Sequence, residues 1–201
     1  MRCVPKRELA NEKIDFFSQE MASSSSHNNK GIPLAALLEW YKIRDTFFGQ
    51  NFVDQNIPLA VALAASCQHP DAQWLTKACV GKDDKEFFFA LGHNDARALC
   101  FAWLCCTWHE QGELTPLRRS AELGFAFAQA WMAEQTPGNE RLMFAQLAAG
   151  QGECDGFYWL GDYFRIGEGC EKDLDKAKEN FWLASELGHV SAMDLLGLLL
   201  G

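Results

Sequence analysis

The chain contains 201 residues, of which 48% are hydrophobic, and its formal net charge is −9 at pH 7. This hydrophobic content is sufficient for a folded core and excludes a largely disordered chain. The negative charge argues against nucleic acid as the main partner, because Lys and Arg are needed to displace the counterions around phosphates. β-Branched residues are sparse and no long apolar–polar alternation occurs, so we expect an all-α protein.

The sequence does not predict a membrane span or a secretory signal. Its longest uncharged apolar run, residues 57–67, is far shorter than the ~20 residues needed to cross a bilayer. The first residues mix both charge signs and do not resemble a signal peptide. We therefore expect a cytoplasmic protein without membrane contact, in which the eight cysteines remain thiols.

The N-terminal part of the chain is expected to lie apart from the main domain. Residues 5–21 can form a short amphipathic helix, and the Ser/Asn-rich tract that ends at residue 31 has no apolar side chain to bury, which predicts a flexible linker. These two segments make up residues 1–31. A domain of stacked helices is expected over residues 32–201, and its first two helices are predicted at 33–48 and 58–67.

A short pattern then returns five times along the chain. A residue that ends a helix is followed three positions later by a residue that starts the next helix, and then by a small residue. The five copies are Gln68/Asp71/Ala72, Gly92/Asp95/Ala96, Gly124/Phe127/Ala128, Gly152/Asp155/Gly156 and Gly188/Ser191/Ala192. Asp or Ser can accept a hydrogen bond from an unpaired N–H group at a helix start, and Gly can close the preceding helix in a left-handed conformation. Each copy is therefore predicted to begin the first helix of a helical hairpin.

Within these first helices, large apolar residues recur at helical spacing. Counted from the small residue, position +3 holds Leu75, Leu99, Trp131, Trp159 and Leu195. Together with position +4, this stripe is predicted to form the core. Small residues at position +5, such as Gly161 and Gly197, let neighbouring helices approach closely. The second helices are predicted to start at Asp83 or Asp84, Thr115, Asn139 and Asp173.

The most complete copy carries a recognisable set of residues. They are Gly156, Leu160-Gly161, Phe164, Gly167-x-Gly169, Asp173, Lys176-Ala177, Phe181-Trp182, Ala184 and Glu186-Leu187-Gly188-His189. This set resembles the Sel-one-like repeat family, a relative of the tetratricopeptide repeat. The resemblance implies a superhelical stack of antiparallel helix pairs, an α-solenoid, with about 4 to 5 hairpins. It also implies an inner face that binds peptides or proteins, without chemistry of its own.

The inner face is predicted to display positions +2, +6 and +9 of the first helices. These positions carry Trp74, Cys105, Glu134, Tyr158, Asp162 and Arg165. A mixture of aromatic and acidic side chains suits a protein or peptide partner with basic and apolar residues. The alternative interpretation is that Trp74 and Tyr158 are half-buried packing residues.

The sequence contains one group of residues with metal-ligand spacing. Cys105, Cys106 and His109 fall on one predicted helix, but a zinc site needs four ligands and nothing nearby completes the set. No nucleophile elbow or phosphate-binding glycine loop is present. We therefore expect no catalytic site, no metal and no cofactor.

The histidines have a structural explanation. His69, His93 and His189 each follow a predicted helix stop, where an imidazole can bond the open carbonyls of the helix end.

The leading hypothesis is a non-enzymatic adaptor or scaffold that binds a polypeptide on its concave face. A structural subunit of a larger assembly is the alternative, and an enzyme or metal-dependent protein using Cys105, Cys106 and His109 is a third class. The chain ends in an apolar first helix that contains Leu195, Leu196, Leu199 and Leu200. This edge is expected either to continue into a longer chain or to associate with another molecule, including a second copy.

Overall fold

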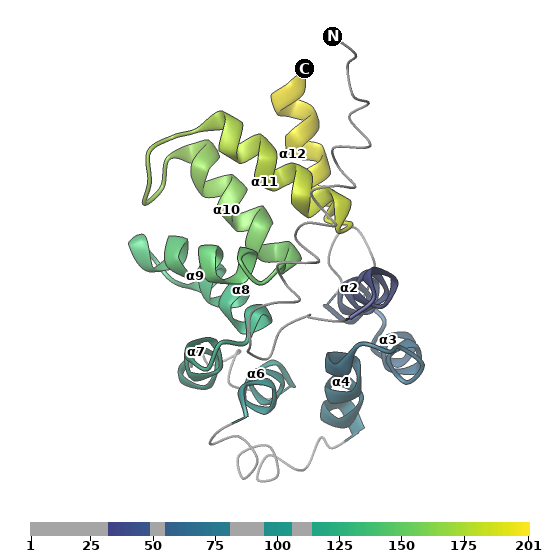
Figure 1. Cartoon of the computed structure of the whole chain (residues 1–201). Helices are drawn as coiled ribbons and strands as arrows, with labels where there is room; N and C mark the ends of the chain where they lie inside the picture. Colours follow the sequence, from purple (N-terminus) through teal and green to yellow (C-terminus); the bar gives the residue numbers. More distant parts are fainter. Residues whose placement is uncertain (1–31, 49–54, 81–94, 106–113) are drawn as a thin grey trace.

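The computed structural model describes residues 32–48, 55–80, 95–105 and 114–201, and in these ranges it contains ten α-helices and no strand (Figure 1). The helices are α2 (Leu34–Phe48), α3 (Ile57–Ala64), α4 (Pro70–Val80), α6 (Ala96–Cys105), α7 (Thr115–Glu122), α8 (Ala126–Gln135), α9 (Asn139–Ala149), α10 (Cys154–Ile166), α11 (Leu174–Glu186) and α12 (Val190–Leu200). The all-α prediction is confirmed. The predicted N-terminal helix and linker lie outside the described residues.

Helices that follow one another in the chain pack as antiparallel pairs. The pairs are α2 with α3, α6 with α7, α8 with α9 and α10 with α11, and they are piled one on the next from α2 to α12 (Figure 1). Some first helices of successive hairpins also touch, since α4 contacts α6 and α8 contacts α10. The architecture is therefore the predicted α-solenoid.

Two of the predicted capping residues cap their helices as expected. Oδ1 of Asp173 accepts hydrogen bonds from two N–H groups at the start of α11, and Oδ1 of Asp95 does the same for α6. At Asp155 the prediction is wrong. Helix α10 begins at Cys154 with Glu153 as its N-cap residue, and neither the Glu153 nor the Asp155 side chain accepts a capping hydrogen bond. Asp155 is instead bound by an arginine from α2.

Two of the predicted structural histidines cap helices, but not in the predicted way. Nδ1 of His69 accepts the N–H of Asp71 at the start of α4, and Nδ1 of His189 accepts the N–H of Ala192 in α12, both at 3.2 Å. Each imidazole therefore serves the helix that follows and not the open carbonyls of the helix before, so His189, and not Ser191, caps α12. His93 lies outside the described residues.

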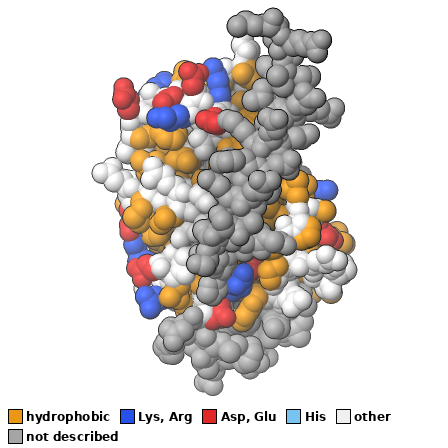
Figure 2. Space-filling model, in the orientation of Figure 1, with side chains coloured by type: hydrophobic (Ala, Val, Ile, Leu, Met, Phe, Trp, Pro, Cys, Tyr) orange, Lys and Arg blue, Asp and Glu red, His pale blue; other side chains and the backbone are white. Residues whose placement is uncertain are grey.

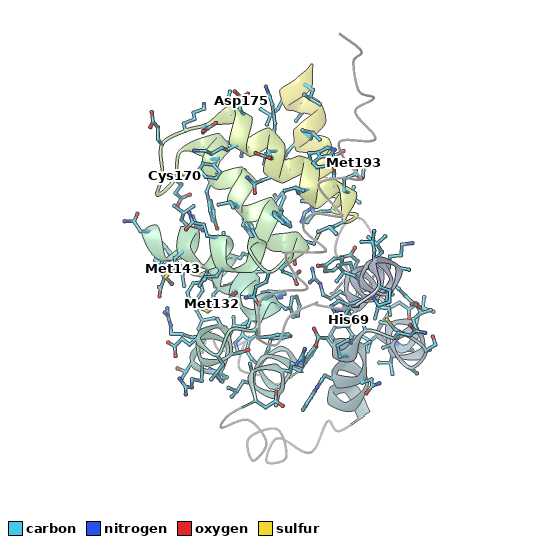
Figure 3. All side chains as sticks on the ribbon, viewed as in Figure 1. His69, Met132, Met143, Cys170, Asp175 and Met193 are labelled. Atoms are coloured by element: carbon cyan, nitrogen blue, oxygen red, sulfur yellow. The ribbon has the colours of Figure 1, made fainter. Side chains whose placement is uncertain are left out.

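The two capping imidazoles also stack on aromatic rings. His69, which is labelled in Figure 3, lies against Trp40 of α2 with ring centroids 5.3 Å apart, and His189 lies against Tyr158 of α10 at 4.2 Å. The same contact thus recurs at two levels of the stack. Each histidine joins a helix start to the aromatic residue of a neighbouring helix.

Stability is expected to fall as the pH drops from about 6.5 to about 4, and His69 is expected to account for much of the loss. Burial lowers the pKa of His69 from 6.5 to about 4, although the Asp71 carboxylate raises it. The unfolded chain therefore binds more protons than the folded chain in this window, so the stabilisation is complete above the unfolded pKa and is lost on acidification. A pKa shift of this size corresponds to about 3 kcal/mol.

The variant His69→Asn tests this expectation, because an Asn oxygen can cap a helix but does not titrate in this range. Urea unfolding of both proteins across the window should give a shallower pH dependence for the variant. Loss of the stacking on Trp40 lowers the stability of the variant near neutral pH but does not affect this slope. Equal slopes in the two proteins would show that His69 is not the titrating group.

Close helix packing occurs where the sequence predicted it, at Gly161. A Cβ atom there would lie 2.9 Å from the Phe181 ring of α11. Gly156, at the start of α10, is packed even more tightly, since a Cβ would lie 2.5 Å from the backbone nitrogen of Ala149. The same prediction is wrong at Gly197 in α12, where a Cβ would meet nothing within 4 Å.

The core stripe differs from the prediction at position +3, where Leu99, Trp131, Trp159 and Leu195 are only partly buried. Leu75 is buried as expected, and so are Cys100 and Met132 at position +4. The rings of Trp131 and Trp159, which were predicted to be core, are only partly buried and lie at the edge of the core.

Candidate functional site

A hollow of about 250 Å³ lies between α8, α10 and the start of α12. All three are first helices of their hairpins, so the hollow is on the side of the stack that was predicted to be the inner face. Its lining residues are Ala130, Trp131, Glu134, Asp155, Tyr158, Trp159, His189 and Ser191.

Aromatic rings form the walls of this hollow, and other rings hold them from behind. Tyr158 and Trp159 meet edge to face at 5.0 Å, and Tyr158 is backed by the stacked His189. Trp131 packs edge to face on Trp103 at 5.5 Å. Because aromatic packing of this kind restricts ring motion, the walls are already in place before any partner arrives.

Two carboxylates in the hollow differ in what they contact. Glu134 is exposed and, within the described part of the chain, takes part in no hydrogen bond or ion pair. Desolvation raises its pKa, and the charge of Asp155 raises it further. The two acids are therefore close enough to repel each other across the hollow.

Arg44 of α2 holds Asp155 in place from the side of the core. Its Nη1 donates to Oε1 of Glu153 at 2.6 Å and its Nη2 to Oδ2 of Asp155 at 2.5 Å, while the guanidinium lies over the Phe127 ring. Burial raises the pKa of Glu153 to about 7 against the effect of Arg44, and Asp155 adds to the rise. One guanidinium thus serves two carboxylates, and the group keeps an excess of negative charge when both are ionised.

The five predicted partner-binding residues lie in three different surroundings in the structure. Glu134 and Tyr158 come together in the hollow. Asp162 and Arg165 form an ion pair with each other on α10, with Nη2 to Oδ1 at 2.5 Å. Trp74 is half-buried on α4 and packs against the core. Partner binding by all five residues stays a prediction.

Of the eight lining residues, sequence reasoning predicted only Glu134 and Tyr158, and several of those that it missed had been given other roles. Trp131 and Trp159 were assigned to the core, and Asp155 was assigned to a helix cap. A signal was present, because position +3 is a tryptophan only in the two consecutive helices α8 and α10. Leu occupies this position in the other copies.

The metal hypothesis falls largely outside the described residues. Cys106 and His109 lie beyond them, and the side chain of Cys105 is not described. Among the residues that are described, no three His, Cys, Asp or Glu side chains gather as metal ligands do. Cys67, Cys100, Cys154 and Cys170 carry free thiols.

The surface of the stack has further apolar areas, and hydrophobic side chains appear beside acidic and basic ones on the face shown in Figure 2. On α12, Leu198 is 78% exposed and Leu200 is 66% exposed.

None of the described helices is both long and apolar enough to cross a membrane.

The stacked helical hairpins place this chain in the class of helical-repeat solenoids, and the hollow lies between the first helices of its hairpins. Two solved structures are similar to this chain. One is a Sel1 repeat protein from Oxalobacter formigenes, at 19% identity and a TM-score of 0.47 over 82% of this chain and 44% of that one. The other is a protective antigen of uropathogenic Escherichia coli that displays an SLR fold, at 19% identity and a TM-score of 0.39 over 92% of this chain and 35% of that one.

Both solved proteins carry the repeat type that the sequence resembles. The chain spans less than half the length of either protein. No family model matches the chain, and no curated protein matches it.

Proposed function

We propose that the chain is a protein-interaction scaffold that binds a peptide segment in the hollow between α8, α10 and α12. The observation that carries this proposal is the combination of preformed aromatic walls with Glu134, a carboxylate without a partner in the described part of the chain. Aromatic residues dominate the energetics of protein interfaces, and a fixed ring loses little entropy when a partner binds. No catalytic step is part of the proposal.

A selection from a random peptide display library with the full chain tests this function. We expect the recovered peptides to bind in the hollow, so that charge reversal by Glu134→Lys weakens them about tenfold or more. Glu134 is exposed, so this change should leave the helical circular dichroism unchanged. Trp159→Leu, checked for folding in the same way, should weaken the same peptides.

Glu186→Lys provides the matched control. Glu186 is an exposed glutamate at the end of α11 and does not line the hollow. The proposal is wrong if no peptide is enriched, or if the two charge reversals affect binding equally.

The structural-subunit alternative is favoured by the apolar surface of α12, where Met193 is also 52% exposed (Figure 3). A measurement of the mass of the chain at several concentrations distinguishes it from peptide binding. Association through α12 would make the apparent mass of the chain depend on concentration, and Glu134→Lys would leave that dependence unchanged.

A further inference from the structure

The hollow has more acidic than basic groups. Glu134 and Asp155 face it, and within the described residues the guanidinium that Asp155 binds, that of Arg44, is shared with the buried Glu153. His189, which also lines the hollow, does not supply a compensating charge at neutral pH, because burial lowers its pKa and its Nδ1 is used as a hydrogen-bond acceptor. The nearby Arg165 is engaged by Asp162.

The same carboxylates act on Tyr158, which also lines the hollow. Burial raises the pKa of Tyr158, and the charge of Asp162 raises it further, with smaller contributions of the same sign from Glu134 and Asp155, while Arg165 lowers it. Several carboxylates thus act on one ring at the edge of the hollow. A cation placed there would reduce this repulsion.

The walls suit a cation that is carried on an apolar stem. Trp131 and Trp159 are partly buried and offer aromatic surface on two adjacent helices. Aromatic faces attract ammonium and guanidinium groups, and lysine and arginine lay their methylene chains along apolar surface while the charged end stays near polar groups. The hollow of about 250 Å³ is several times the volume of one water molecule, ~30 Å³, so a side chain can enter it.

We propose that the hollow is a subsite for the cationic side chain of a lysine or arginine of the bound peptide, with the charge beside Glu134 and Asp155 and the methylene stem between Trp131 and Trp159. This inference rests on the proposed function and names the residue type that the hollow selects. Glu134 gains the partner that it lacks within the described chain. Asp155 is already oriented by Arg44, so little is lost in ordering it.

The test uses the full chain and three small probes, the Nα-acetyl N-methylamides of lysine, arginine and norleucine. Norleucine has the stem of lysine without the ammonium group. The indole N–H signals of the protein, assigned with Trp131→Phe and Trp159→Phe variants, are followed by NMR during each titration. We expect saturable shifts of these two signals with lysine or arginine, and at least about fivefold weaker binding of norleucine.

Two controls tie the binding to the hollow. Glu134→Gln should weaken the cationic probe about three- to tenfold, and higher salt should weaken it in the unchanged protein. Glu186→Gln, at an exposed position that does not line the hollow, should leave the affinity unchanged. The proposal is overturned if norleucine binds as well as lysine, or if neither Glu134→Gln nor salt weakens the lysine probe.

The outcomes also separate this inference from the proposed function. If selected peptides keep their affinity after every Lys and Arg is replaced by norleucine, the scaffold function stands and the cation subsite is wrong. If no peptide is selected but lysine still shifts the two indole signals, the subsite stands and the scaffold function is wrong. If no peptide is selected and no probe shifts the signals, both are wrong.

Discussion

Arg44→Met is expected to destabilise the fold by about 3–5 kcal/mol, because it leaves two carboxylates beside each other without the guanidinium that pairs them. Arg44 is 2% exposed and reaches both Glu153 and Asp155. Its removal also takes a cation from the face of the Phe127 ring. Chemical denaturation of the two proteins at one pH measures the difference.

The pH dependence of this loss identifies its cause. Burial already raises the pKa of Glu153 to about 7, and removal of Arg44 raises it further. A carboxyl whose folded pKa lies above its unfolded value binds more protons in the folded state, so its effect on stability worsens as the pH rises. The deficit of Arg44→Met should therefore be larger near pH ~8 than near pH ~5.

Two further variants serve as controls for Arg44→Met. The double variant Arg44→Met/Glu153→Gln should recover part of the loss, since it removes one of the unpaired charges. Arg119→Met breaks an exposed pair with Glu122 and should change stability by less than about 1 kcal/mol. A similar effect of Arg44→Met and Arg119→Met would refute the role given to the buried group.

Gly156→Ala is expected to destabilise the protein by about 2–4 kcal/mol, although alanine is the better helix former. The added Cβ would lie 2.5 Å from the backbone nitrogen of Ala149 and 2.6 Å from the Cβ of Ala148. Backbone atoms cannot rotate away as a flexible side chain can. The contact can be relieved only by moving α10 away from α9, which disturbs the packing between two hairpins.

Gly197→Ala is the matched control for this effect. It is the same change inside a helix, but its Cβ would meet nothing within 4 Å, so stability should stay equal or rise by up to about 1 kcal/mol. Thermal or urea unfolding of both variants gives the comparison. A loss of the same size at Gly197 would mean that local helix conformation, and not the contact with α9, explains Gly156.

The features predicted correctly from the sequence are those with local causes. Asp173 caps α11 through its own next residues, and helices begin at Thr115 and Asn139 as expected. Gly161 lies where two helices approach, which the spacing from Gly156 indicated. These signals lie within a few residues of the structure that they produce.

The candidate site was only partly predicted, because its determinants are distant in sequence. Asp155 looked like a helix cap, yet its partner Arg44 is 111 residues away. Whether Trp131 and Trp159 are buried depends on how neighbouring hairpins are rotated against each other, and the helical period of one segment does not determine that rotation. Glu134 and Tyr158 were found because their positions on the helix agree with the face that the stack leaves open.

The contact of Arg44 with Glu153 joins residues 109 positions apart, whereas the stability of a repeat stack generally comes from adjacent units. A purely local stack can fray from either end, and its units can be gained or lost one at a time. Here the first described helix, α2, is tied to the start of α10, the third helix from the end of the described array. The repeats from α2 to α10 are therefore expected to unfold as one cooperative unit, which sets a limit on the evolutionary insertion or deletion of hairpins between them.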